Sequence, residues 1–169
     1  MDQRSGCPIN LTVEVLGDKW TLIVLRDIMF GNFRTYGELH GHSLEGIATN
    51  TLADRLKRLV ENGLLSLAPD PTHKQRGIYS LTEAAIQLVP VMAALGSWGV
   101  RHLPASPDLA ARAIALGAGG PAMWSAFEDE LRHLHLGAPK PARSVLVTLE
   151  AAYQAALAQQ NAASRARSP

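Results

Sequence analysis

The chain has little net charge and a single cysteine. Its formal net charge is +1 over 169 residues, and Cys7 is its one thiol. A lone cysteine excludes an internal disulfide framework. The weak net charge means that bulk electrostatics do not indicate a nucleic-acid partner, so any such interface must come from the local placement of Arg and Lys.

Long apolar runs are also missing, and 47% of the residues are hydrophobic against 18% charged. No run approaches the roughly 18 apolar residues of a transmembrane helix. Residues 1–6 lack the charged-then-apolar pattern of a signal peptide. We therefore expect a cytoplasmic protein without a membrane partner, built as one domain or as a small domain with an appendage.

Motifs of catalysis and cofactor binding are absent. The chain has no P-loop, dinucleotide-binding glycine motif or nucleophile elbow. His133 and His135 alternate on an expected helix and point about 200° apart, so they are poorly placed to share a metal with His102. Glu128, Asp129 and His133 lack a nucleophile motif beside them. We expect no enzyme activity, no cofactor and no metal site.

What the chain does contain is a particular order of elements. Apolar spacing predicts a short helix over 35–40 with Tyr36 and Leu39 inward, then a turn over 41–46. A long amphipathic helix follows over 48–62, and two strands are expected at 64–68 and 78–81, joined by a polar loop. That order is a helix-turn-helix with a β-wing, in which the second helix enters the DNA major groove.

Further helices are expected on both sides of this motif. One over 19–30 begins after Asp18, a good N-cap, and ends at Gly31, whereas residues 9–16 fit either a helix or a strand. Another is expected from Thr82 to His102, kinked or restarted at Pro90.

The C-terminal third is expected to be helical as well. After a linker, helices are predicted at the ranges 108–116, 121–136 and 144–158, separated by glycine-containing breaks. The expected fold is therefore mainly α with a small β-wing, a winged helix-turn-helix with additional C-terminal helices. We expect a DNA-binding and dimerisation domain over 1–103, a helical extension over 104–160 and a disordered tail over 161–169.

Over residues 7–102 the sequence resembles the HxlR-type winged-helix regulators, relatives of the MarR superfamily. The motifs that carry the resemblance are Cys7-Pro8, Leu16-Gly17-Asp18-Lys19-Trp20, Phe33-Arg34, Leu52-x-x-Arg55-Leu56-x-x-Leu59, Gly63-Leu64, Tyr79-Ser80-Leu81-Thr82 and Trp98-Gly99. Ala48 and Ala85 stand where that family often has Ser and Gly. The resemblance implies a homodimer, a palindromic or pseudo-palindromic operator and regulation of nearby genes.

The candidate DNA-contacting residues come from the second helix and the wing. They are Thr49, Asn50, Thr51, Asp54, Arg55, Lys57 and Arg58 of the helix, and Lys74 and Arg76 of the loop. Asn pairs bidentately with adenine, and Lys and Arg suit phosphates. Asp54 either accepts from cytosine or holds a neighbouring Arg, and Arg55 suits a structural ion pair as well as DNA. The alternative for the whole set is a solvated helix face.

Two further sets of residues bear on assembly and signalling. Leu88, Val91, Leu95 and Trp98 recur at three- and four-residue spacing, which fits pairing with the same helix of a second copy or packing onto the chain's own C-terminal helices. The resemblance implies that a subset of the family senses oxidants, quinones or aldehydes through the cysteine at the position of Cys7. The alternative for Cys7 is a small apolar residue without a sensor role.

The sequence therefore predicts a homodimeric, sequence-specific DNA-binding transcriptional regulator. Its expected partners are double-stranded DNA, a second copy and a small-molecule effector held near the C-terminal helices. Two other interpretations remain open: a winged-helix module for protein contacts without DNA binding, and a small helical enzyme whose site lies in the C-terminal segment.

Overall fold

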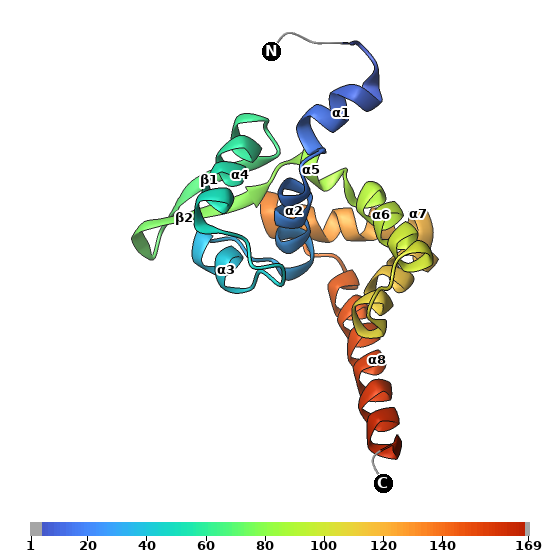
Figure 1. Cartoon of the computed structure of the whole chain (residues 1–169). Coiled ribbons are helices and arrows are strands. Elements are labelled where there is room, and N and C mark those ends of the chain that lie inside the picture. The colour runs from blue at the N-terminus through green and yellow to red at the C-terminus, as the bar shows by residue number, and fades with distance from the viewer. Residues whose placement is uncertain (1–4, 168–169) are drawn as a thin grey trace. The chain divides into compact units, whose positions relative to one another are not determined.

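The computed structural model describes the backbone of residues 5–167, and the side chains of these residues except Lys74, Ala166 and Arg167. The chain forms two compact units that divide between Ala85 and Ile86 (Figure 1).

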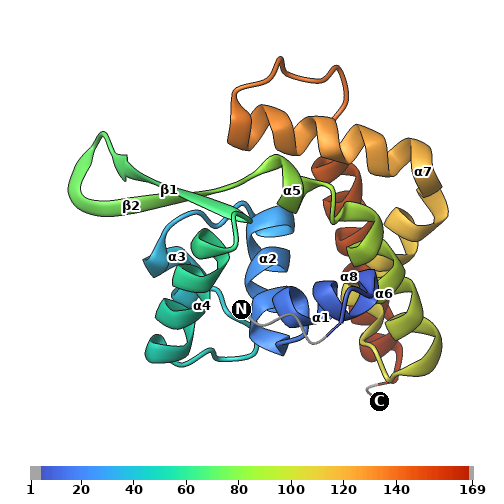
Figure 2. The ribbon, with the colours of Figure 1, turned by 90° about the horizontal axis from the view of Figure 1, so that it is seen from above.

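The N-terminal unit holds the helix-turn-helix and the wing. Its elements are α1 (Pro8–Leu16), α2 (Lys19–Gly31), α3 (Tyr36–Gly41), α4 (Thr49–Glu61), β1 (Leu65–Asp70) and β2 (His73–Leu81). The ambiguous stretch before residue 17 is helical and begins at Pro8, whose fixed φ suits the first turn of a helix. The expected winged helix-turn-helix order is thus confirmed, and the wing extends from the helices as a two-stranded ribbon (Figure 2).

Helix α2 is the central element of this unit and contacts α1, α3, α4 and β2. The predicted N-cap is confirmed, because Asp18 Oδ1 accepts from the backbone N–H groups of Trp20 at 2.9 Å and Thr21 at 3.3 Å. The predicted end of the helix at Gly31 is confirmed, because Gly31 is the last residue of α2. Gly31 is still helical, and Asn32 takes the left-handed conformation with φ 50°, which Asn tolerates better than most residues.

Helix α3 begins with a capping box. The Thr35 side chain accepts from the Glu38 N–H, and the Glu38 carboxylate accepts from the Thr35 N–H. Leu39 is buried as expected, but the inward placement of Tyr36 is wrong, because Tyr36 lies on the surface. The hydroxyl of Tyr36 lies at the start of α4, where it contacts Thr49.

The wing is longer and its turn tighter than the sequence suggested. The strands β1 and β2 pair antiparallel, with Leu65 opposite Leu81 and Asp70 opposite His73, so only Pro71 and Thr72 form the turn. The expected loop over 70–76 is therefore largely strand. The sequence does not show the full length of the strands, because most of β1 is exposed. Its residues therefore lack the alternation of apolar and polar side chains that marks a half-buried strand.

The C-terminal unit contains three long helices, preceded by the short α5 (Glu83–Ile86), which crosses the division between the units. They are α6 (Val89–His102), α7 (Pro107–Leu136) and α8 (Val145–Arg167). Helix α7 packs on both α6 and α8. Pro90 lies in the first turn of α6, so the expected restart at this proline is confirmed.

A single glycine interrupts α7, whereas the sequence predicted a break over residues 117–120. Gly120 has φ 58° and ψ −159°, and Pro121 follows it, so the helix kinks there and continues. Gly117 stays helical, and a Cβ atom at this position would lie 2.5 Å from Ser97 Oγ of α6. Close packing between α6 and α7 explains this glycine, which the sequence suggested was part of a loop.

Helix α8 also extends further than expected. The predicted disordered tail over 161–169 differs from the structure, in which α8 remains helical to Arg167. Ala, Gln and Arg dominate this end of the helix, and all three have high helix propensity, which explains the difference.

The segment Glu83–His102 is long and apolar enough to cross a membrane by length and composition, with a mean hydropathy of 1.3. This differs from the expectation that no run is long enough. The structure breaks the segment at Gln87 and Leu88 into α5 and α6. Helix α6, with 14 residues, rises about 21 Å, short of the about 30 Å hydrocarbon core of a bilayer.

Candidate nucleic-acid interface

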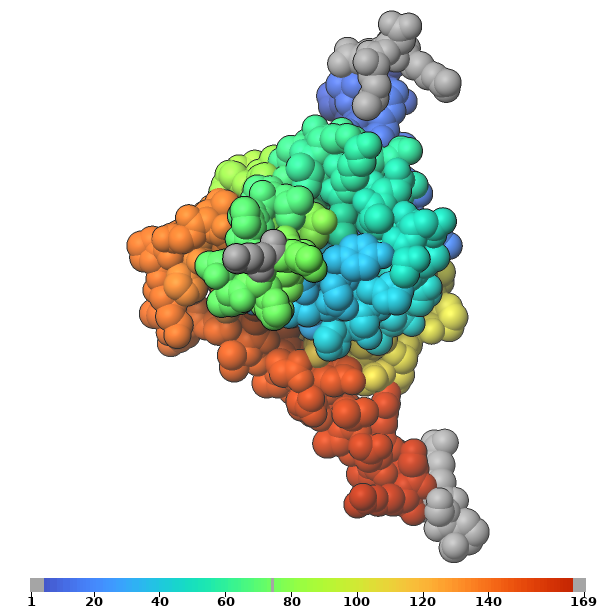
Figure 3. All heavy atoms as spheres, turned by 90° about the vertical axis from the view of Figure 1, so that its left-hand side faces the viewer, coloured from blue at the N-terminus to red at the C-terminus, as the bar shows by residue number. Residues whose placement is uncertain are grey.

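Helix α4 turns one face into the core and the opposite face to solvent. Leu52, Leu56 and Leu59 are at most 2% exposed, and the helix contacts α2, α3 and β1. Thr49 and Asn50 are exposed at its first turn. The surfaces of α3, α4 and the wing adjoin on one side of the N-terminal unit (Figure 3). This side therefore presents a helix edge and a ribbon together.

The first turn of α4 is held by polar contacts that do not come from its N-cap. The methyl side chain of Ala48 cannot accept a hydrogen bond to cap the helix. Asn50 Oδ1 instead accepts from the Thr51 N–H at 2.9 Å. The Tyr36 hydroxyl donates to the Thr49 carbonyl at 2.9 Å. Tyr36 thus ties α3 to the start of α4, a role that sequence analysis missed because the tyrosine fitted the inward stripe.

Arg55 joins α4 to the start of α2. Its Nε lies 3.4 Å from Asp18 Oδ1, and its Nη2 lies 3.3 Å from Asp54 Oδ2. The Arg55 side chain is 19% exposed, so it is half-buried between these carboxylates. These contacts favour the ion-pair interpretation of Arg55, and a DNA contact for it stays a prediction.

The two remaining cations of α4 also have acidic partners on the same helix. Arg58 Nε lies 3.1 Å from Asp54 Oδ2, and Lys57 Nζ lies 3.7 Å from Glu61 Oε1. Both cations are exposed, at 60% for Arg58 and 74% for Lys57. They are therefore accessible to phosphates, but each has a carboxylate within reach in the free protein.

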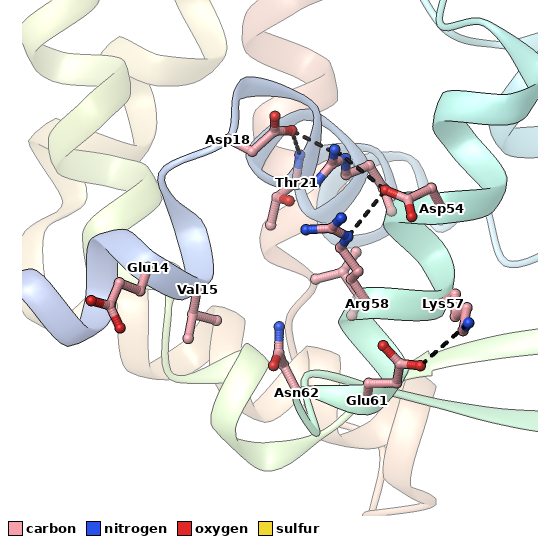
Figure 4. A pocket seen from close by; sticks show the side chains of 11 residues that line it. Glu14, Val15, Asp18, Thr21, Asp54, Lys57, Arg58, Glu61 and Asn62 are labelled. Atoms are coloured by element: carbon pink, nitrogen blue, oxygen red, sulfur yellow. Dashed lines mark hydrogen bonds and ion pairs between the residues drawn. The ribbon is translucent and has the colours of Figure 1, made fainter. Parts of the chain in front are cut away.

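A shallow hollow of about 420 Å³ lies beside this part of α4 (Figure 4). It is lined by Glu14 and Val15 of α1, by Asp18 and Thr21 at the start of α2, and by the charged side of α4 from Asp54 to Asn62. Its walls carry both carboxylates and cations, which pair along α4 and, through Arg55 and Asp18, between α4 and the start of α2. Such walls do not form the apolar pocket expected of an effector site.

A carboxylate organises the turn of the wing. The side-chain and backbone groups of Thr72 donate to Asp70 Oδ1, both at 2.7 Å, and Arg76 donates to Asp70 Oδ2. These contacts, those of Thr72 above all, lower the pKa of Asp70 from 3.8 to about 2. Arg76 is half exposed and paired, and the side chain of Lys74 lies outside the described part.

Arg34 connects the segment before α3 with β2. Its Nε donates to the Tyr79 carbonyl at 3.2 Å, and its Nη2 donates to the Ser80 hydroxyl. Burial lowers the pKa of Arg34 from its usual value. The sequence identified this arginine only as part of a motif, since Tyr79 and Ser80 are more than 40 residues away.

The candidate dimer residues lie on the side of α6 away from α7. Val91, Leu95 and Trp98 are 42%, 47% and 52% exposed, and Leu88 is half-buried. The buried residues of α6 are instead Val89 and Ala93. Val91, Leu95 and Trp98 therefore lie outside the packed core of this unit, and pairing with a second copy stays a prediction.

Cys7 is an exposed free thiol at the N-cap of α1. Its N–H donates to the Ser5 hydroxyl at 3.1 Å, and its carbonyl accepts from the Leu11 N–H at 3.0 Å. Among the described residues no three His, Cys, Asp or Glu side chains form a group able to hold a metal. The sensor role of Cys7 stays a prediction.

Residues 15–107 match the sequence model of a family described as HxlR-like helix-turn-helix. A relative from Mycobacterium bovis, an uncharacterized HTH-type transcriptional regulator, is 37% identical over 99 residues, which are 59% of this chain and 61% of the relative. One from Synechocystis, described in the same way, is 37% identical over 55% of this chain and 67% of its own length.

Solved structures give the same likeness. PA1607, described as a transcription factor, is 31% identical with a TM-score of 0.55 over 62% of this chain and 70% of its own. A MarR-family regulator from Porphyromonas gingivalis W83 is 28% identical with a TM-score of 0.51 over 61% of this chain and 99% of its own. The chain spans about three fifths of the length of the mycobacterial relative, and the family match ends at residue 107, at the start of α7.

Proposed function

Because the chain belongs to the HxlR-like helix-turn-helix family, we propose that it is a transcriptional regulator that binds duplex DNA sequence-specifically. The observation that carries the proposal is the placement of α4. Its leucine face is buried, its first turn exposes Thr49 and Asn50, and the surface of the helix adjoins that of the wing (Figure 3). An exposed helix edge of this kind fits the major groove.

The residues of this surface have different roles in the proposal. Asn50 contacts adenine, and Thr49 and Thr51 donate or accept at neighbouring base edges or phosphates. Lys57 and Arg58 contact backbone phosphates on the groove flank. Lys74 and Arg76 do the same from the wing, and Arg55 acts by holding α4 against the start of α2.

The regulator acts as a homodimer in this proposal. The exposed stripe of α6, formed by Leu88, Val91, Leu95 and Trp98, pairs with the same stripe of a second copy. Burying these side chains removes apolar surface from water, which is a main driving force of association. Two copies then contact two half-sites about 34–36 Å apart. Such a protein acts on the chromosome, so we place it in the cytoplasm.

Cys7 is the proposed site of a chemical signal. It is exposed, and the chain has no second cysteine, so an oxidant converts it either to a Cys7–Cys7 disulfide across the dimer or to a sulfenate, and an electrophile such as a quinone alkylates it. Oxidant or quinone treatment of the wild type and of Cys7→Ser tests this step. Release of DNA by the wild type alone supports it, and equal release by both proteins removes Cys7 from the mechanism.

Selection of bound fragments from the source genome tests the proposal as a whole. We expect a shared, two-fold symmetric site whose affinity falls with salt. Asn50→Ala should weaken binding to that site by about 1–3 kcal/mol. Lys57→Ala should weaken all duplexes alike and reduce the salt slope by about 1.

Failure of the wild type to enrich any site, or unchanged affinities in both variants, would contradict DNA recognition by α4. A protein-contact module would show no saturable, salt-dependent duplex binding at all.

A further inference from the structure

We propose that Asp54 determines how well the interface distinguishes its own site from other duplex DNA. In this proposal Asp54 holds Arg55 and Arg58 in ion pairs and opposes phosphate contacts that are made without the right bases. The inference rests on the proposed function, because it assigns a role within the same DNA-binding surface.

Asp54 lies between two arginines on the exposed side of the helix. Its Oδ2 is 3.3 Å from Arg55 Nη2 and 3.1 Å from Arg58 Nε, and its side chain is 46% exposed (Figure 4). Arg55 is also bound to Asp18, which caps α2. Asp54 therefore belongs to a chain of ion pairs that reaches the start of α2 through Arg55.

The charges of α4 nearly cancel. Three cations and two carboxylates lie within Thr49–Glu61. Binding to non-cognate DNA depends almost wholly on phosphate contacts made by cations. A cation that already has a carboxylate partner must exchange it for a phosphate, and the carboxylate then faces a like charge. The acidic residues of α4 consequently weaken non-cognate binding.

Asp54 differs from a general acidic residue because of its register. It follows Asn50 by four residues, so the two side chains lie on the same side of the helix. When Asn50 is seated on a base edge, Asp54 lies above the groove floor, where amino groups of cytosine and adenine are donors. When the helix rests on the backbone, Asp54 lies against phosphates. Asp54 therefore lowers the affinity for non-cognate DNA more than the affinity for the selected site.

Glu61 provides the matched comparison. It is on the same helix, its replacement by glutamine changes the charge equally, and its contact to Lys57 is longer, at 3.7 Å. Both side chains of that pair are more than half exposed, and Glu61 follows Asn50 by eleven residues, far from the first turn. Glu61 should thus contribute general charge and little discrimination.

The experiment compares affinities for the selected site and for a scrambled duplex of equal length over a range of salt concentrations. Asp54→Asn keeps the side-chain size and should raise affinity for the scrambled duplex about tenfold near 0.1 M salt, with a salt slope steeper by about 1. Affinity for the selected site should change by less than about threefold. Glu61→Gln should leave the ratio between the two duplexes near that of the wild type, and so should Asp54→Glu.

Several outcomes would overturn the inference. One is an unchanged ratio of the affinity for the selected site to that for the scrambled duplex in Asp54→Asn. Another is an equal fall of this ratio in Asp54→Asn and Glu61→Gln. A third is a loss of affinity for both duplexes in an Asp54→Asn protein that melts like the wild type. If Asp54→Asn melts early, Asp54→Ser is measured in its place under the same criteria. Absence of any site for the wild type would instead contradict the proposed function itself.

Discussion

Single carboxylates organise much of the N-terminal unit. Asp18 caps α2 through Trp20 and Thr21, and it also meets Arg55 of α4. The cap was predictable from the sequence, because its donors are the next residues along the chain. The contact to Arg55 was not, because it joins two residues 37 positions apart and depends on how α2 and α4 pack.

Asp70 gives a prediction in the wing. The lowered pKa of about 2 means that the folded wing binds a proton on this group less readily than the unfolded chain does. Its contribution to stability is therefore complete above the unfolded pKa of about 3.9 and is lost as the pH falls through about 2. Carboxyl NMR titration should give that midpoint.

Two variants separate the causes of the Asp70 shift. Thr72→Val removes the hydroxyl donor, the largest single contribution, but keeps the side-chain shape and the backbone N–H contact, and it should raise the pKa of Asp70. Arg76→Gln removes the cation and should raise it as well. An unchanged pKa in Thr72→Val would show that the ion pair, rather than the turn, fixes this carboxylate.

At the scale of the element, α4 begins without a capping side chain. Ala48 is exposed and has φ −68° and ψ 146°, an extended conformation that suits an N-cap residue. Ala48→Ser should stabilise the N-terminal unit by about 0.5–1 kcal/mol by accepting from an N–H of the first turn. Chemical unfolding measures the gain. A destabilised variant would mean that Asn50 already meets this need.

The junction of α7 and α8 depends on one buried carboxylate. Glu130 accepts from the N–H groups of Val145 at 2.7 Å and Leu146 at 3.1 Å, and from the Ser144 hydroxyl. Glu130→Ala should cost about 2–3 kcal/mol, because hydrogen bonds to a charged group are lost and buried donors remain. Circular dichroism during thermal unfolding monitors the loss of helix.

Asp129→Ala is the matched control for Glu130. Asp129 is the preceding residue of α7, its side chain is 62% exposed, and it pairs with Arg132 on the surface. Its loss should change stability by less than about 1 kcal/mol. Equal effects of the two alanine variants would contradict the capping role of Glu130.

The sequence predicted elements with a buried stripe better than exposed ones. Helix α4 was expected over 48–62 and spans Thr49–Glu61, because Leu52, Leu56 and Leu59 mark one face. The wing was predicted too short, because its strands lie mostly in solvent and their pairing leaves no apolar alternation. The contact of Tyr36 with α4 was missed for a similar reason, since an aromatic residue fits either side of a short helix.

At the scale of the whole molecule, the family match and the compact units divide the chain differently. The match covers 15–107, whereas the units separate after Ala85, so α6 belongs to both the matched region and the C-terminal unit. The expected boundary at residue 103 followed the resemblance. No sequence pattern marked the earlier division, because α5 and α6 continue one apolar segment.

Dimerisation through the α6 stripe can be tested with a charged substitution. Leu95→Lys places a charge in the α6 stripe and should convert a dimer to a monomer, with a loss of affinity for a two-half-site operator. Ile114→Lys on α7 is the control, since Ile114 is similarly exposed but lies outside the stripe. Analytical ultracentrifugation measures both variants. Dissociation by Ile114→Lys alone, or by neither, would contradict pairing through α6.

The most direct test of DNA recognition by the first turn of α4 is a double-substitution cycle between Asn50 and adenine. The selected duplex is made with 7-deazaadenine at one position of each half-site, which removes the N7 acceptor of that base. For the contacted adenine, the wild type should lose affinity on this duplex, whereas Asn50→Ala should bind both duplexes equally. Equal losses for the wild type and for Asn50→Ala at every adenine of the site would show that Asn50 does not contact adenine N7.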